Sequence, residues 1–158
     1  MRTAMTAGLI VSAVALAACG RRSVEIDPNA QPVTARWNAT LASPAALAGA
    51  LQVSGSGWMG HREKNPTQTH AHVTISNAAP GGRHPWHVHR GQCGDDLGVL
   101  GPADAYSVLK VGGDGQATGD ADLPLPLPTT GQYFINVHAS AANMSTIVAC
   151  GNLAPPAQ

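Results

Sequence analysis

Charged and aromatic side chains are scarce in this sequence. Of its 158 residues, 11% are charged and 4% are aromatic, with a single Phe. Nine Lys and Arg residues balance nine Asp and Glu residues, and the basic ones form no run, which excludes an electrostatic nucleic-acid interface. A Gly-x-Ser-x-Gly elbow, a phosphate-binding glycine loop and paired catalytic carboxylates are also absent, which removes the commonest hydrolase and nucleotide sites.

Glycine and proline are abundant instead, at 18 and 12 residues. This composition favours short strands and tight turns over long helices, and the length suits one domain. Turn signals lie at 77–82 and 112–115, and the proline run 123–128 is expected to be a crossover or an edge ribbon. Segment 43–51 is either a short helical turn or the start of a strand. The pattern predicts an all-β antiparallel sandwich or flattened barrel with strands at 33–41, 50–57, 67–76, 84–90, 104–111, 116–123, 132–139 and 146–153.

The N-terminus has the features of a secretory signal peptide, residues 1–18, with an apolar run too short to span a bilayer. The run ends in Leu-Ala-Ala-Cys, which looks like a bacterial lipobox and predicts lipidation of Cys19; the alternative is an ordinary signal with a chance cysteine. Gly20, rather than Asp, at the next position favours a periplasmic protein anchored to the outer membrane. The predicted remainder is a tether at 19–32, a domain at 33–154 and a tail at 155–158.

Two cysteines remain once Cys19 is assigned to lipid. An even pair in an oxidising compartment predicts a disulfide between Cys93 and Cys150, and metal-binding thiolates are the alternative. Closing this loop of 57 residues (150 minus 93) would stabilise the fold by about 4 kcal/mol in the chain-entropy model.

Histidines recur at the spacing that places two side chains on one face of a strand. His87 and His89 project together, with Val88 turned to the core, and His70 and His72 do the same on the preceding strand. A hairpin through the 77–82 turn would make these two strands neighbours. His138 lies in another strand, and imidazoles from two strands can converge on copper or zinc. A lone strand histidine is usually only a satisfied polar residue, so the paired spacing carries the prediction.

Three motifs resemble the copper/zinc superoxide dismutase family. His-Pro-Trp-His-Val-His at 84–89 looks like the family's His-Gly-Phe-His-Val-His signature, Val-His-Ala at 137–139 resembles its later V-H-A/E motif, and Ala-Cys-Gly at 149–151 its terminal A-C-G. The resemblance covers about residues 33–154 and implies an eight-stranded Greek-key β-barrel, with Cys93 and Cys150 as the intrasubunit disulfide. It also implies that His87, His89 and His138 are the copper ligands and catalytic residues, with His84 in a structural place beside them and Trp86 as the core aromatic.

The sequence departs from that family pattern at several positions. No histidine lies between His89 and His138, so the bridging histidine and the zinc site are not expected. The fourth copper ligand would be His70, His72, water or Met144, whose thioether would favour Cu(I). Ile147 stands where the family has an anion-guiding arginine, and the loop 140–145 is short. The aspartates of the loop after Cys93, at positions 95, 96 and 104, are expected to be solvated.

The resemblance therefore implies a copper-binding lipoprotein that dismutates superoxide to oxygen and hydrogen peroxide, without zinc. The missing arginine favours an alternative, a periplasmic copper carrier, buffer or resistance protein without enzymatic activity, in which His70 and His72 form a second or completing chelate. A third reading is a structural envelope domain that has lost its metal. A related possibility is a CHRD-type domain, because Phe-Ile-Asn-Val-His at 134–138 resembles a strand found in such domains.

Overall fold

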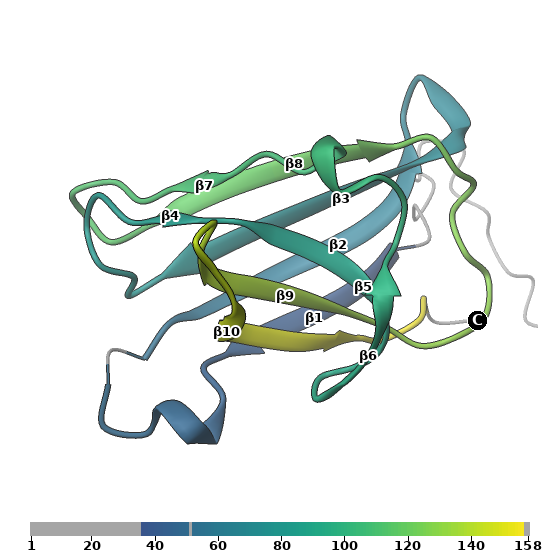
Figure 1. Ribbon diagram of the computed structural model, residues 1–158. Helices are drawn as coiled ribbons and strands as arrows, with labels where there is room; N and C mark the ends of the chain where they lie inside the picture. The colour runs from purple at the N-terminus through teal and green to yellow at the C-terminus, as the bar shows by residue number, and fades with distance from the viewer. Residues whose placement is uncertain (1–35, 51, 157–158) are drawn as a thin grey trace, which may run out of the picture. The chain divides into compact units, whose positions relative to one another are not determined.

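The computed structural model describes residues 36–50 and 52–156, which form an all-β structure. The expected signal peptide, the lipidated Cys19 and the tether lie outside the described residues. One curled antiparallel sheet holds eight strands in the order β6-β5-β9-β10-β1-β2-β3-β8, and a second sheet pairs β4 with β7 (Figure 1). The strands are β1 (Arg36–Ala42), β2 (Ser54–Arg62), β3 (Asn65–Ser76), β4 (Arg83–His84), β5 (Trp86–Gln92), β6 (Asp95–Val99), β7 (Leu109–Lys110), β8 (Ala117–Leu123), β9 (Tyr133–Ser140) and β10 (Asn143–Leu153).

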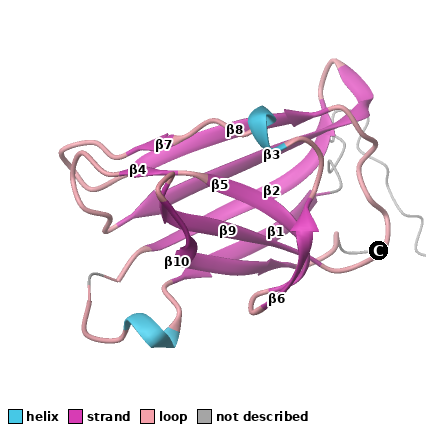
Figure 2. Cartoon of the chain, viewed as in Figure 1, coloured by secondary structure: helices cyan, strands magenta, loops and turns pink. Residues whose placement is uncertain are grey.

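Helical structure in the described residues is limited to two short 3-10 turns, η1 (Ala45–Leu47) and η2 (Ala103–Ala105) (Figure 2). The η1 turn settles the ambiguity of segment 43–51 in favour of a helical turn. No helix among the described residues is long and apolar enough to cross a membrane.

The core follows from the period-two alternation of apolar residues. In β1 and β8 every second residue is buried, so each strand presents one face to the interior and one to solvent. The largest side chains on the inner face include Trp37, Trp86, Ile75 and Leu109, all nearly inaccessible to solvent. Trp86 therefore occupies a core position, and its indole Nε1–H donates to the Ser107 carbonyl at 2.7 Å.

The chain does not form a hairpin between β3 and β5, so that prediction is wrong. β3 pairs with β2 and β8, whereas β5 pairs with β6 and β9. The connecting residues use their backbone donors elsewhere: Ala78 N–H donates to the Gly115 carbonyl and Gly81 N–H to the Val111 carbonyl, both at 3.0 Å. The segment 77–82 is therefore a crossover that packs on the turn between β7 and β8.

The region between β5 and β8 also differs from the prediction. The strand expected at 104–111 is replaced by η2 and the two-residue β7, and β6 forms where a solvated loop was expected. Near the end of β5, where the chain turns towards β6, Gly91 has φ 99°. A Cβ at this position would collide with the Asp95 carbonyl, so the turn requires glycine. The predicted proline-rich connection is correct, since residues 124–132 form a crossover from β8 to β9.

The expected disulfide is present. Cys93, in the turn after β5, is joined to Cys150 of β10, with 6.0 Å between the two Cα atoms. The bond excludes the alternative in which these two sulfurs are metal-binding thiolates. It ties together strands that flank β9, the strand that contains His138.

Candidate metal site

The candidate metal site lies on the paired strands β5 and β9. In β5, Trp86 and Val88 turn towards the core, so His87 and His89 lie together on the opposite face. The register places His87 opposite Asn136 and His89 opposite Phe134. His138 lies two residues after Asn136 in β9, on the same face as His87 and His89. The backbone N–H of His138 donates to the Pro85 carbonyl at 2.8 Å. One strand pair therefore positions all three imidazoles.

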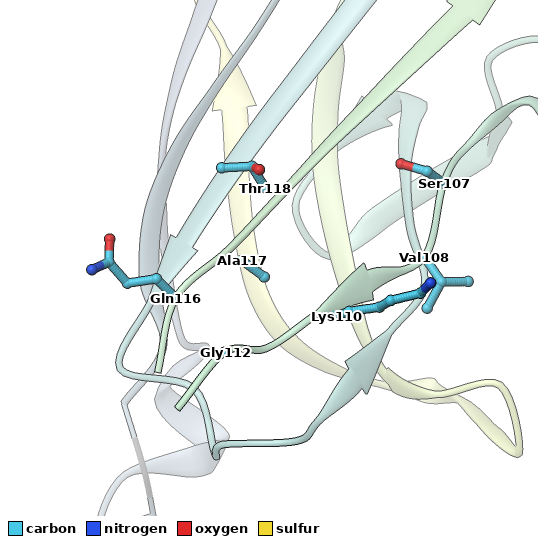
Figure 3. Close-up of a pocket in the computed structure, with 7 residues that line it drawn as sticks. All are labelled: Ser107, Val108, Lys110, Gly112, Gln116, Ala117 and Thr118. Atoms are coloured by element: carbon cyan, nitrogen blue, oxygen red, sulfur yellow. The ribbon is translucent and has the colours of Figure 1, made fainter. Parts of the chain in front are cut away.

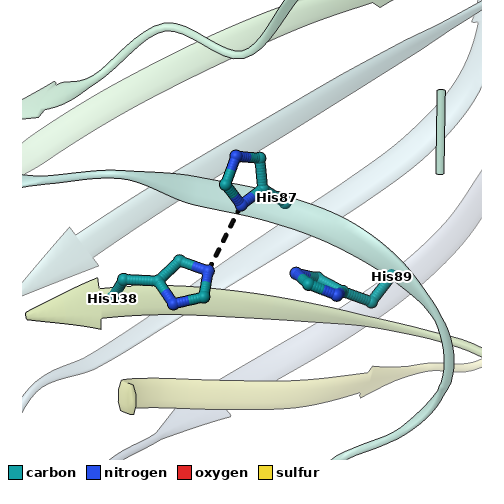
Figure 4. A group of neighbouring side chains, drawn as sticks. All are labelled: His87, His89 and His138. Carbon is teal, nitrogen blue, oxygen red and sulfur yellow. Dashed lines mark hydrogen bonds between the residues drawn. The ribbon is translucent and has the colours of Figure 1, made fainter. Parts of the chain in front are cut away.

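The three rings face one another (Figure 4). Each offers a nitrogen, and these nitrogens all lie within 4.8 Å of one another. His87 Nδ1 is 3.2 Å from His138 Nε2, close to the ~3.3 Å that separates two ligands of a tetrahedral ion with 2.0–2.1 Å bonds. All three side chains are buried, with exposed fractions of 8%, 4% and 5% for His87, His89 and His138. We call these three residues the triad.

Two outer hydrogen bonds fix which nitrogens face inward. His138 donates its Nδ1–H to the Met144 carbonyl at 2.6 Å, and His89 donates its Nδ1–H to Asp96 Oδ1 at 2.9 Å. In the neutral imidazole the other nitrogen then carries a lone pair, so both residues present Nε2 to the centre. Such partners orient ligating histidines in metalloproteins and raise their basicity.

The inward lone pairs fit a metal ion. His89 Nε2 is buried and has no hydrogen-bond partner, and a buried polar atom without a partner is destabilising. His87 Nδ1–H donates to the lone pair of His138 Nε2, so a proton lies where two imidazole nitrogens converge. A cation bound by the three nitrogens would replace that proton and satisfy His89 Nε2. The triad can therefore hold a metal ion.

Burial also keeps the imidazoles of His87 and His138 neutral, as ligands must be. Desolvation, followed by repulsion from His138 and His89, lowers the pKa of His87 from 6.5 to about 4. Desolvation lowers the pKa of His138 as well, against the opposing effect of its bond to Met144. The neutral imidazole is the form that binds metals, so at neutral pH these two ligands need lose no charge on binding.

Asp96 is the functional residue that the sequence prediction missed. It is about half exposed, in β6, and was expected only to be solvated. Desolvation raises the pKa of this carboxyl, but hydrogen bonds from Gly98 N–H and His89 together bring the pKa below its ordinary value. The carboxylate therefore stays charged and holds the His89 ring. The sequence does contain an indication of this role. Asp95 and Asp96 follow His89 closely and lie between Gly94 and Gly98, a pattern that permits a hairpin back onto β5.

The remaining predicted residues take different places. His84 lies beside the triad and donates Nδ1–H to the His138 carbonyl at 3.0 Å, so it supports the strand that bears a ligand. Met144 contacts His138 through its carbonyl, while its side chain is 38% exposed. His70 and His72 do not join the triad, because β3 pairs with neither β5 nor β9 and both rings bond to aspartates of β8. The prediction that His70 or His72 is the fourth ligand of the copper ion at the triad is therefore wrong.

Aromatic rings pack on the triad from two sides. Phe134 stacks on His89 with 5.2 Å between ring centroids, and Tyr106 meets His87 edge-on at 5.1 Å. The Tyr106 hydroxyl donates to the Leu100 carbonyl at 2.7 Å, and burial raises its pKa, so the ring stays neutral. These contacts restrict the imidazole rotamers and exclude water from part of the site.

No protein-family model matches the chain, and no curated protein matches it either. The case for a metal therefore depends on the side chains and their hydrogen bonds.

A cavity of about 820 Å³ adjoins the triad on the side of His138. Among the described residues its lining is mostly apolar, contains no Lys or Arg, and has Asp96 as its one charged side chain. Ile147 lies in this lining and is the register partner of His138. Another hollow, between β7 and β8, is lined by Lys110 but by no His, Cys or carboxylate of the described residues (Figure 3). Of these two, only the cavity beside His138 gives access to a candidate reactive centre.

Proposed function

We propose that this chain is a copper-binding protein of the superoxide dismutase-like type, with one ion held by His87, His89 and His138. The observation that carries the proposal is the set of three inward nitrogens, one of them buried without any partner. Imidazole suits copper and zinc, and copper(II) stands highest in the order of affinities of first-row divalent metals. Both cysteines of the described domain are in a disulfide, so thiolate does not compete to select zinc.

The proposal extends to the fold family. An all-β sheet in which β5 and β9 bear the three histidines and a disulfide links the turn after β5 to β10 agrees with the three sequence motifs. We assign the curled sheet to the Greek-key barrel of copper/zinc superoxide dismutases on that agreement. The same proposal places the protein in the bacterial periplasm, anchored to the outer membrane by lipid on Cys19.

A bound copper ion supplies one-electron redox chemistry, which is what dismutation of superoxide to oxygen and hydrogen peroxide requires. The chain contributes neutral imidazoles, an Asp96 carboxylate that holds His89, and a partly dehydrated site beside Phe134 and Tyr106. The described residues contribute no Lys or Arg to the cavity beside His138. Superoxide, an anion, would therefore approach Asp96 and Ile147 without electrostatic guidance.

That lining favours a second candidate function, copper buffering or transport in the envelope. A mostly apolar cavity with one carboxylate suits a cation better than an anion. The triad alone would be sufficient for this role, whereas rapid dismutation requires anion capture as well. The two functions use the same ligands and differ in turnover.

The test measures tightly bound copper and superoxide turnover on one sample. The full-length protein is loaded with copper(II), dialysed against a weak chelator and analysed for metal, beside the variants His87→Gln/His89→Gln and His61→Gln. We expect one retained equivalent in the wild type and in His61→Gln, whose altered imidazole is exposed on β2, and none in the double variant. Equal copper in all three would contradict the site. Retained copper without turnover would select the buffering function.

A further inference from the structure

A second group of metal-ligating side chains lies on the outer face of β3 and β8. Here His-Ala-His of β3 runs antiparallel to Asp-Ala-Asp of β8, with His70 opposite Asp122 and His72 opposite Asp120. Ala71 and Ala121, between them, are buried, so the four polar side chains share the solvent face. We call His70, His72, Asp120 and Asp122 the outer-face cluster.

The two imidazoles converge on one carboxylate oxygen. Asp120 Oδ1 lies 2.7 Å from His72 Nδ1 and 3.3 Å from His70 Nε2. Asp122 has a different task, since it accepts the Nδ1–H of His70 at 2.8 Å and also forms an ion pair with Arg62 at 3.0 Å. Asp120 thus faces two imidazoles, while Asp122 orients one of them.

The geometry at Asp120 favours a cation. When His70 donates Nδ1–H to Asp122 as a neutral imidazole, its Nε2 carries a lone pair that faces the Asp120 carboxylate, which is also an acceptor. At 3.3 Å these two groups attract each other only through a cation, either a proton on Nε2 or a bound metal ion. On the other ring, His72 Nε2 lies 3.2 Å from Thr74 Oγ1, a hydroxyl that can either donate or accept. Binding of a cation at His72 Nδ1 is therefore compatible with that contact.

The two distances to Asp120 are close to those between the ligands of one ion. The 3.3 Å between His70 Nε2 and Asp120 Oδ1 already equals the ~3.3 Å between two ligands of a tetrahedral ion with bonds near 2.0–2.1 Å. The His72 contact must lengthen by roughly 0.6 Å to reach that separation. The side chain of Asp120 is 59% exposed, so it is free to move. Trp58 packs on both rings, at 5.3 Å from His70 and 5.7 Å from His72, and limits the movement of the imidazoles.

We propose that His70, His72 and Asp120 form a second, surface-accessible site for a divalent transition-metal ion such as copper(II) or zinc(II). Imidazole and carboxylate oxygen are both ligands of these borderline ions. Asp122 is a positioning residue that holds the His70 ring. The site is independent of the triad, because no residue and no strand is shared between them.

The test counts copper(II) equivalents bound by the full-length chain in equilibrium dialysis without a competing chelator, with tryptophan fluorescence recorded on the same samples. We expect the wild type to bind two equivalents, His70→Gln/His72→Gln one and His61→Gln two. Asp120→Asn keeps both imidazoles and should bind the second equivalent at least tenfold more weakly. The second equivalent should quench fluorescence in the wild type much more than in Trp58→Phe, because Trp58 contacts both rings.

The outcomes separate this site from the triad. If the wild type binds one equivalent, and His70→Gln/His72→Gln removes it while His87→Gln/His89→Gln does not, the outer site stands and the copper triad fails. If His70→Gln/His72→Gln binds as many equivalents as the wild type, the outer site is refuted. Since both altered residues are exposed or half-buried on the outer face, the far-ultraviolet circular dichroism of that variant should match the wild type.

Discussion

The metal-free protein should lose stability between pH 6.5 and pH 4.5 because of His87. Burial lowers the pKa of His87 from 6.5 to about 4 in the folded state, whereas the unfolded chain keeps the ordinary value. The stabilising effect is therefore complete above pH 6.5 and is lost as the pH falls, because only the unfolded state then binds the proton. Below pH 4 both states are protonated and the loss ends.

The magnitude follows from the same values. One proton bound only by the unfolded state costs ~1.4 kcal/mol for each pH unit, so the interval from 6.5 to about 4 costs about 3 kcal/mol. His138, whose pKa is also lowered by burial, acts in the same direction. Asp96 does not contribute above pH 4.5, since its pKa lies below its ordinary value of 3.8.

Urea denaturation of the metal-free protein at pH 7.5, 5.5 and 4.5, at constant ionic strength, measures the effect. His87→Gln is the control, because it removes the titrating group and keeps a polar side chain of comparable length. We expect the free energy of unfolding of the wild type to fall by about 2 to 3 kcal/mol more than that of His87→Gln between pH 7.5 and 4.5. Parallel pH profiles for the two proteins would refute the assignment of a buried, neutral His87.

Three further changes test other parts of the structure. Replacing Cys93 and Cys150 together by Ala should lower the free energy of unfolding by about 4 kcal/mol in urea denaturation, since a loop of 57 residues is released; a loss below 1 kcal/mol would contradict this. Asp96→Asn should weaken copper binding about 10- to 100-fold in a competition titration, because the carboxylate no longer holds the imidazole, while the circular dichroism spectrum stays unchanged. Ile147→Arg should raise superoxide turnover about tenfold at low salt, an effect that salt suppresses, whereas Leu97→Arg, exposed on β6, should not; equal rates in both variants would show that guidance is not limiting.

Local pattern predicted much of this fold. The alternation of apolar residues in β1 and β8 depends on the two-residue period of a strand, which no tertiary contact alters. The same period placed His87 and His89 on one face, with Val88 in the core. The proline run predicted the end of β8, because proline lacks the backbone N–H that pairing with a neighbouring strand requires.

Strand pairing could not be predicted from such local patterns. A turn of suitable composition at 77–82 indicated a hairpin, but its donors bond to Gly115 and Val111, which are at least 30 positions away in the sequence. The prediction that Asp96 is only solvated is wrong for a similar reason, because a polar residue in a glycine-rich loop usually is solvated. Its role depends on β6 folding back on β5, and this pairing is visible only in three dimensions.

The triad draws every ligand from one antiparallel pair of strands, β5 and β9. No loop has to close and no second layer has to dock before the three nitrogens meet. The centre is therefore a compact module that could be transplanted: two paired strands of seven and eight residues, with Asp96 supplied by one flanking strand and the Met144 carbonyl by the other, would transfer it to another antiparallel sheet. A designed protein that presents these residues in the same register would show how much of the metal affinity belongs to the strand pair alone.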